Sequence, residues 1–256
     1  MDESSPGLRV GSVPYLNAAP LTWGLEKEIL LYPPSELAVK LRCGEIDAGL
    51  VSVTEVLFND RYDVLDGIAV ASRGEVKSVF LAYRKPIELA REVFCDPASL
   101  TSVNLLRVLL TEKGQHAELR PLPVEFPREL PDYFLLIGDQ ALRFLQQPRS
   151  HAIWDLGAAW FDAHRLPFVF AVWAVRRGVE TKALRARLRE ARDEGLANTE
   201  AIVAKHSEYE PHFVREYLSR HLRYQLGPEE KRGLAKFAEL LEGQNIGQIF
   251  PPRYVS

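Results

Sequence analysis

Residues 8–20, LRVGSVPYLNAAP, change from an apolar strand to a polar turn within a few positions. Residues 8–13 have the composition of a short buried strand, and Pro14 ends it because proline lacks a backbone N–H donor. The turn that follows carries Tyr15 and Asn17. In proteins that alternate strands with helices, ligands bind where a strand ends in such a turn. The sequence therefore predicts a binding site directly after its first strand.

The same order of strand, polar turn and helix recurs along the chain. Apolar strands are predicted at residues 46–53, 91–95 and 133–137, and the last two are followed by helical patterns at 102–110 and 140–146. Strands that alternate with helices favour parallel sheets covered by helices, with ligand sites at the carboxyl ends of the strands. An α/β fold is therefore expected.

Two prolines mark where the chain is expected to pass between two lobes. Pro86 ends an apolar alternation, and Pro167 precedes a buried strand that crosses back. We assign residues 1–85 and 175–256, which include the C-terminal helices, to the first lobe, and residues 86–174 to the second. Two lobes joined by two crossings predict a ligand cleft between them.

The composition favours a small-molecule partner. With 256 residues, 46% of them hydrophobic, the chain can bury a large core. A net charge of −3 gives no basic surface for nucleic acid, and no apolar run is long enough to span a membrane. Residues 1–7 are polar and do not resemble a signal peptide, so a cytoplasmic location is expected.

Common catalytic motifs are missing from the sequence. GxSxG, HExxH, GxxxxGK[ST] and GxGxxG do not occur, which argues against acyl transfer, metalloproteolysis, and the binding of nucleotides or dinucleotides. Cys43 and Cys95 have no CxxC pattern and no histidine at metal-ligand spacing. We therefore expect structural roles for both cysteines and predict no metal site.

Several predicted strand-to-helix turns carry clustered small polar residues. A helix start offers free backbone N–H donors and a favourable dipole, so such a turn suits a carboxylate without a cationic residue. The alternative for each residue alone is that it only caps a helix. The candidate groups are Ser12 with Tyr15 and Asn17, Ser52 with Thr54, Thr101 with Ser102 and Asn104, and Gly138 with Asp139. Tyr15 and Trp154 are also candidates to wall in an unsaturated ring, with core packing as the alternative.

Seven stretches, taken in order, resemble the motifs of the chorismate dehydratase family. They are residues 11–20 (GSVPYLNAAP), 41–51 (LRCGEIDAGLV), 74–79 (GEVKSV), 99–102 (SLTS), 136–142 (LIGDQAL), 155–157 (DLG) and 166–173 (LPFVFAVW). The resemblance implies the type II periplasmic-binding-protein fold, in agreement with the two lobes expected above. The sister enzyme of that fold, 1,4-dihydroxy-6-naphthoate synthase, typically has a C-P-N-D-T turn where this chain has residues 14–17 (PYLN).

The resemblance also implies a reaction. Chorismate would lose water to give 3-[(1-carboxyvinyl)oxy]benzoate, in menaquinone biosynthesis by the futalosine route, with no cofactor and no metal. Asn17 is the candidate for handling the departing hydroxyl group. The proton is expected to go either to the enolpyruvyl carboxylate of the substrate or to Asp139, if burial raises the pKa of that residue. The expected substrate-binding residues are Ser12, Tyr15, Ser52, Ser78, Val79, Thr101, Ser102, Asn104, Gly138 and Trp154.

Two other functions stay open at this stage. The chain could be the sister synthase, or a binding protein that holds a small carboxylate without turning it over. An assay of the purified protein with chorismate separates them, since only the dehydratase releases one water without a metal or cofactor. A homodimer is compatible with the sequence but not predicted by any motif.

Overall fold

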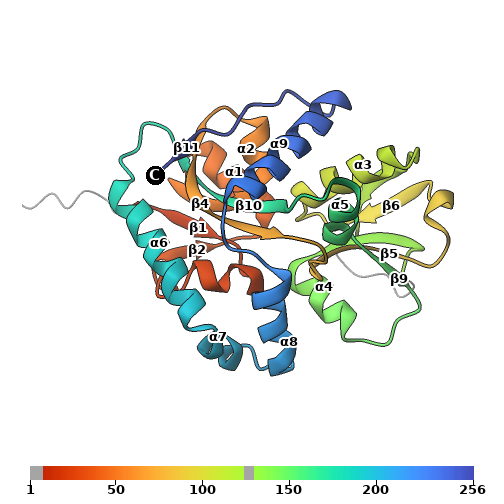
Figure 1. Cartoon of the computed structure of the whole chain (residues 1–256), viewed down its shortest axis with the longest axis horizontal. Helices are drawn as coiled ribbons and strands as arrows, with labels where there is room; N and C mark the ends of the chain where they lie inside the picture. Colours follow the sequence, from red (N-terminus) through yellow and green to blue (C-terminus); the bar gives the residue numbers. More distant parts are fainter. Residues whose placement is uncertain (1–7, 124–129) are drawn as a thin grey trace, which may run out of the picture.

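The computed structural model describes residues 8–123 and 130–256 and contains two β-sheets that lie side by side (Figure 1). The first sheet has the strand order β11-β4-β10-β3-β1-β2, and the second has the order β7-β6-β8-β5-β9. Helices pack on both sheets, so the predicted α/β class is confirmed.

The strands of the first sheet come from both ends of the chain. They are β1 (Val10–Ser12), β2 (Ile29–Leu31), β3 (Ala48–Ser52), β4 (Tyr62–Ser72), β10 (Phe168–Arg176) and β11 (Tyr254–Val255). The second sheet uses the middle of the chain. Its strands are β5 (Val79–Tyr83), β6 (Glu92–Cys95), β7 (Glu118–Pro121), β8 (Tyr133–Ile137) and β9 (Ala152–Asp155).

The first α-helix begins and ends at residues that capping chemistry favours. Helix α1 (Pro34–Cys43) has a proline at its first position, where no N–H bond is lost, and ends at Gly44 with φ of 78°. The others are η1 (Leu16–Leu21), α2 (Val53–Phe58), η2 (Ile87–Leu89), α3 (Thr101–Glu112), α4 (Gly138–Leu145), α5 (Leu156–His164), α6 (Lys182–Ala197), α7 (Thr199–Lys205), α8 (Pro211–Glu216), η3 (Tyr217–His221) and α9 (Pro228–Gly243).

Both sheets are mixed, which corrects the expectation of parallel sheets. Strand β10 runs antiparallel to β3 and β4, and β5 runs antiparallel to β8 and β9. Strand β5 follows the first crossing between the sheets and β10 follows the second, and each runs opposite to its neighbours in the sheet. The apolar content of a buried strand carries no information about its direction, and the sequence pattern therefore could not reveal this.

The predicted lobe boundaries do not coincide with membership of the two sheets. Strand β5 was assigned to the first lobe but pairs in the second sheet, and β10 begins before residue 175 but pairs in the first sheet. The alternation of apolar residues predicts a buried strand in either sheet equally well. Only the pairing partners decide where each strand lies.

Helix α6 holds the segment after β1 in place. It packs against η1, and the contact depends on Gly195, where an added Cβ would overlap the backbone carbonyl of Pro20. The position of η1, which carries Asn17, is therefore set by a close backbone contact with the C-terminal helical segment. Within the described ranges, the helices are too short or too polar to cross a membrane.

Candidate active site

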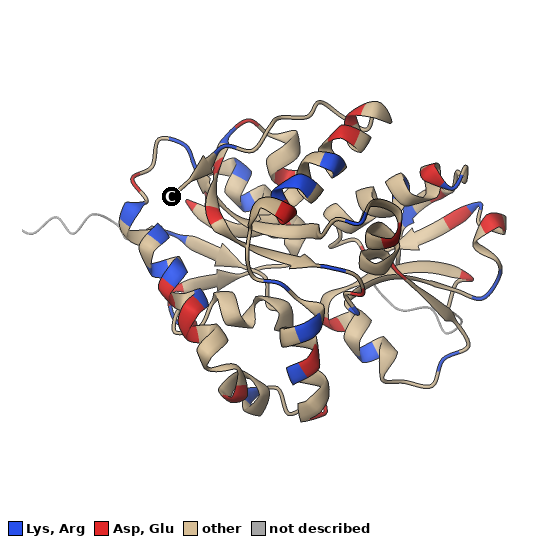
Figure 2. Cartoon of the chain, in the orientation of Figure 1, with Lys and Arg blue, Asp and Glu red and all other residues tan. Residues whose placement is uncertain are grey.

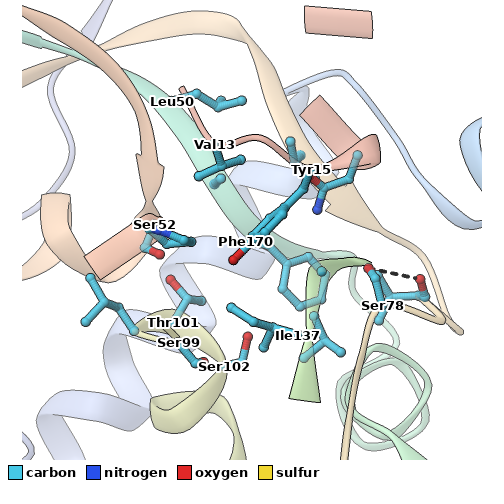
Figure 3. Close-up of a pocket in the computed structure, with 18 of the residues that line it drawn as sticks. Val13, Tyr15, Leu50, Ser52, Ser78, Ser99, Thr101, Ser102, Ile137 and Phe170 are labelled. Carbon is cyan, nitrogen blue, oxygen red and sulfur yellow. Dashed lines mark hydrogen bonds between the residues drawn. The ribbon is translucent and has the colours of Figure 1, made fainter. Parts of the chain in front are cut away.

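A pocket lies between the two sheets and is lined by residues from both (Figure 3). It has about 600 Å³ of space free of protein atoms, counting its opening to solvent. Its lining consists of Val13, Tyr15, Asn17, Pro34, Leu50, Ser52, Val70, Val76, Ser78, Val79, Ser99, Leu100, Thr101, Ser102, Ile137, Gly138, Phe170, Ala171 and Leu222.

Two helices start at this pocket. Thr101 is the first residue of α3, and Gly138 is the first residue of α4. The first N–H groups of a helix have no partner within it, and the dipole places partial positive charge at this end. Gly138 has φ of 57°, and an added Cβ would lie 2.9 Å from the ring of Tyr15. Glycine at this position lets the Tyr15 ring lie directly against the start of α4.

The small polar side chains at the pocket are not used as helix caps. Ser52 is the N-cap of α2 and Leu100 that of α3, yet neither makes a side-chain cap hydrogen bond. Among the described residues, the buried atoms Asn17 Oδ1 and Ser99 Oγ have no hydrogen-bond partner. Asn17 Oδ1 and Ser99 Oγ are therefore free for a ligand, whereas Thr101 Oγ1 accepts the Thr54 N–H. Figure 3 shows Ser99, Thr101 and Ser102 gathered on one side, with Ser78 across from them.

The pocket has a neutral lining. None of the residues that line it is Asp, Glu, Lys, Arg or His. Charged side chains lie mainly along the outer helices and loops, and the strands between them are largely uncharged (Figure 2). Burial, together with the negative charges of Asp96 and Asp139, raises the pKa of Tyr15, so its hydroxyl is a neutral donor or acceptor at physiological pH. An anion bound here would therefore interact with the dipoles of the helix starts and polar side chains, and not with a charged side chain in the lining.

Hydrogen bonds connect elements of the two sheets around the pocket. The Leu16 N–H donates to Asp139 Oδ1 at 3.0 Å. The Thr54 N–H donates to Thr101 Oγ1 at 3.3 Å. The carboxylate of Asp155, which caps α5, accepts from the backbone N–H of Lys77 at 2.7 Å. These bonds join the turn after β1 to α4, the start of α2 to the start of α3, and the crossing into β5 to the start of α5.

Most of the predicted site residues meet at this pocket. Eight of them line it: Tyr15, Asn17, Ser52, Ser78, Val79, Thr101, Ser102 and Gly138. Ser99, which lies in the SLTS turn, was not among the predicted residues, and neither were the apolar walls formed by residues such as Leu50 and Phe170. An apolar residue that faces a ligand has the same sequence signal as one that faces the core.

Four predicted residues do not line the pocket. Within the described part of the chain the Ser12 hydroxyl is buried without a partner, and the Asp139 carboxylate accepts the Leu16 N–H. Asn104 lies one turn into α3, where its amide donates to the Leu100 carbonyl and accepts from Arg107. Trp154 lies in a separate hollow with its ring under the Lys113 ammonium, 5.5 Å from Nζ to the ring centroid. Asn104 on α3 and Trp154 on β9 therefore face away from the site.

The fold and the interlobe pocket define the class of protein: it has the periplasmic-binding-protein fold. A solved protein of Archaeoglobus fulgidus superposes with a TM-score of 0.74 at 18% identity, covering 93% of this chain and 98% of that one. The alkanesulfonate-binding protein SsuA from Xanthomonas axonopodis superposes with a TM-score of 0.69 at 15% identity, covering 97% and 98% of the two chains. At these identities the likeness shows the fold alone.

Sequence comparison places the chain within one family of this class. A family described as "Menaquinone biosynthesis" matches residues 8–243. A chorismate dehydratase from Thermus thermophilus is 35% identical over 93% of this chain and 96% of its own length. A chorismate dehydratase from Campylobacter jejuni is 26% identical over 92% and 98% of the two chains. The chain belongs to this menaquinone biosynthesis family.

Proposed function

We propose that this protein is a chorismate dehydratase, a hydro-lyase that converts chorismate to 3-[(1-carboxyvinyl)oxy]benzoate and water. The observation that carries the proposal is the pocket itself, where two helix starts, the Ser99 hydroxyl and the Asn17 amide oxygen surround an uncharged space, and the last two have no partner among the described residues. Both relatives reported above bear the name of this activity. We further propose that the reaction belongs to the futalosine route and takes place in the cytoplasm.

The lining explains how a substrate with two carboxylates is held without a cationic side chain. The start of α3, with the hydroxyls of Ser99 and Ser102, offers donors to one carboxylate. The start of α4 and the Ser52 hydroxyl offer donors on other sides of the pocket. In a pocket with apolar walls, such fixed dipoles interact more strongly with an anion than they would in water. The role of the protein is then mainly to position the substrate and exclude water.

The elimination balances without a protein base. The C3–H bond breaks, its electron pair forms the new ring double bond, and the C4–O bond breaks as hydroxide leaves. The proton from C3 joins that hydroxide to form water, and the ring becomes aromatic. The residues lining the pocket include no side chain that is ionised at neutral pH. We therefore propose that the enolpyruvyl carboxylate of the substrate takes the C3 proton and passes it to the leaving hydroxide, while Asn17 Oδ1 accepts a hydrogen bond from the C4 hydroxyl and orients it.

Asp139 was the other candidate base, and its geometry argues against that role. Burial, the largest cause, raises the pKa of Asp139, although the Leu16 N–H and the nearby Arg143 lower it. A raised pKa suits a base, but the carboxylate accepts the Leu16 N–H and does not line the pocket. We propose that Asp139 instead holds the turn after β1 against α4.

An Asp139→Asn variant is expected to keep kcat within about threefold of the wild type, because the amide oxygen still accepts the Leu16 N–H. Steady-state turnover of chorismate measures this. The free energy of unfolding of the variant is also expected to lose the part of its pH dependence that comes from residue 139, because an amide does not titrate. In the wild type the raised folded pKa makes the protein less stable as pH rises through it. A loss of kcat of a hundredfold or more in Asp139→Asn would identify Asp139 as the base.

The activity is tested by mixing the purified protein with chorismate in the absence of added metal or cofactor. Ultraviolet absorbance follows formation of the aromatic ring, and mass spectrometry follows loss of one water. Turnover supports the proposal. Tight binding without turnover would contradict it in favour of a carboxylate-binding protein, and turnover only of the substrate of 1,4-dihydroxy-6-naphthoate synthase would contradict it in favour of that enzyme.

A further inference from the structure

The crossing between β4 and β5, residues 73–78, contains a strained turn beside the pocket. Lys77 has φ of 63°, a conformation that residues with a Cβ rarely adopt. Within the described ranges, the other two non-glycine residues with positive φ, Arg165 and Asn245, follow the ends of helices, where this conformation is common. Around Lys77 the chain instead forms a γ-turn, closed by a 2.7 Å hydrogen bond from the Ser78 N–H to the Val76 carbonyl. A γ-turn with positive φ is rare and strained.

The residues on both sides of Lys77 line the pocket. Val76 precedes it and Ser78 follows it. The Ser78 carbonyl accepts the Gly138 N–H at 2.8 Å, so the turn is also joined to the start of α4. The Ser78 hydroxyl donates to the Val76 carbonyl at 3.5 Å, a long bond that is easily exchanged for one to a ligand. The conformation of Lys77 therefore decides where the Ser78 side chain lies in the pocket.

The Asp155 carboxylate holds this turn in place. It accepts the Val76 N–H at 3.1 Å and the Lys77 N–H at 2.7 Å, the two donors that flank the strained bond. The Asp155 side chain is buried, and hydrogen bonds to a carboxylate are stronger than those between neutral groups. Burial raises the pKa of Asp155, and the backbone N–H groups act against this by favouring the charged form. Backbone strain persists only where surrounding contacts determine the conformation, and this carboxylate supplies them.

The start of α5 packs closely against the same crossing. Asp155 also caps α5, because its carboxylate accepts the Ala158 N–H at 3.0 Å. Two positions after Asp155, a Cβ added to Gly157 would lie 2.6 Å from the Gly74 carbonyl and 2.7 Å from the Ser72 hydroxyl. The DLG stretch therefore serves the crossing twice, since its aspartate accepts hydrogen bonds from the turn and its glycine lets the crossing lie against α5.

We propose that Asp155 is a positioning residue for the reaction, which holds Lys77 in the strained turn and thereby presents Ser78 to the substrate. The inference rests on the proposed function and deepens it, since Asp155 itself does not line the pocket. Without the carboxylate, Lys77 is expected to relax to a negative φ, which moves Ser78 and loosens its bond to Gly138. A displacement of about 1 Å at a substrate contact can lower turnover about 100-fold.

The test is a set of variants assayed for chorismate turnover. Asp155→Asn is expected to lower kcat/KM about 10- to 100-fold. Its amide oxygen can still cap α5, but its amide nitrogen then faces the Lys77 N–H, so that two donors oppose each other. Adding Lys77→Gly to Asp155→Asn is expected to restore kcat/KM to within about fivefold of the wild type, because glycine adopts a positive φ without strain.

Two controls accompany these variants. Adding Lys77→Ala to Asp155→Asn removes the same ion pair between Lys77 and Glu75 as glycine does but keeps a Cβ, so it is expected to restore nothing. Asp47→Asn removes another carboxylate that accepts a backbone N–H, that of Arg9 at 2.9 Å. Asp47 precedes β3, whereas Ser52 at the other end of that strand lines the pocket. Asp47→Asn is therefore expected to keep kcat/KM within about twofold.

Thermal unfolding of each variant is measured alongside turnover, since a purely structural role would not distinguish glycine from alanine at position 77. Wild-type kcat/KM in Asp155→Asn, or the same recovery with Lys77→Gly and Lys77→Ala, would overturn the inference alone. If Asp155→Asn does not fold, the double variant with Lys77→Gly decides: turnover near the wild type supports the inference, and failure to fold overturns it. Absence of turnover in the wild-type protein would overturn the proposed function and the inference together.

Discussion

Replacing Asn17 with alanine is expected to lower kcat for chorismate by about 100- to 1000-fold, the range found when one preorganised polar group is removed from an active site. Asn17 Oδ1 is a buried polar atom at the pocket without a partner among the described residues. If it holds the departing hydroxyl, its loss affects the transition state more than substrate binding, so kcat falls more than KM rises. Steady-state kinetics across a range of chorismate concentrations measures both.

Asn17→Asp sharpens this experiment, because it keeps the shape and an acceptor oxygen but adds a negative charge. The charge would face a dianionic substrate in an uncharged pocket, so KM is expected to rise as well. Asn198→Ala is the matched control, since Asn198 is exposed and its amide donates to the Glu194 carbonyl. Full turnover in both Asn17 variants would remove this residue from the mechanism.

The Gly195→Ala variant is expected to lose about 2 to 3 kcal/mol of unfolding free energy, as in other overpacked contacts. An alanine Cβ at this position overlaps the Pro20 carbonyl, which is backbone and can yield only if α6 moves away from η1. For a chain of this size the loss corresponds to a fall in Tm of roughly 4 to 10 °C. Because η1 carries Asn17, kcat is also expected to decrease. Differential scanning calorimetry and turnover measure the two effects.

Gly243→Ala provides the control for this change. Gly243 is also a helical glycine, at the end of α9, but an added Cβ there meets no atom within 4 Å. The general preference of helices for alanine over glycine, about 1 kcal/mol in a helix interior, then makes this variant neutral or slightly more stable. Equal stability of Gly195→Ala and Gly243→Ala would show that the contact between α6 and η1 adapts without cost.

The sequence predicted the polar half of the site because those residues follow strands. Tyr15, Ser52, Thr101 and Gly138 all stand where an apolar strand ends and a helix begins, and the carboxyl ends of strands in α/β folds meet at one crevice. Trp154 was selected only for its chemistry, and its position on β9 places it in a different hollow. Position relative to a strand end was thus the informative signal, and residue type alone was not.

The residues that no local pattern could select are those brought to the site by distant parts of the chain. Leu222 and Phe170 line the pocket from the C-terminal segment and the returning strand. Their sequence surroundings are those of any amphipathic helix or buried strand. The identity of their partners depends on how the two sheets are placed, which is a property of the whole chain.

By itself, the sequence determined that strands alternate with helices, that polar turns follow the strands, and that no charged motif is available for a cofactor or nucleic acid. These are consequences of local backbone preferences and apolar periodicity, which act over a few residues. Only the tertiary structure decided the antiparallel direction of β5 and β10, the neutral lining, and the hydrogen bond that occupies Asp139. Each of these depends on contacts between residues far apart in the sequence, formed only when the whole core packs together.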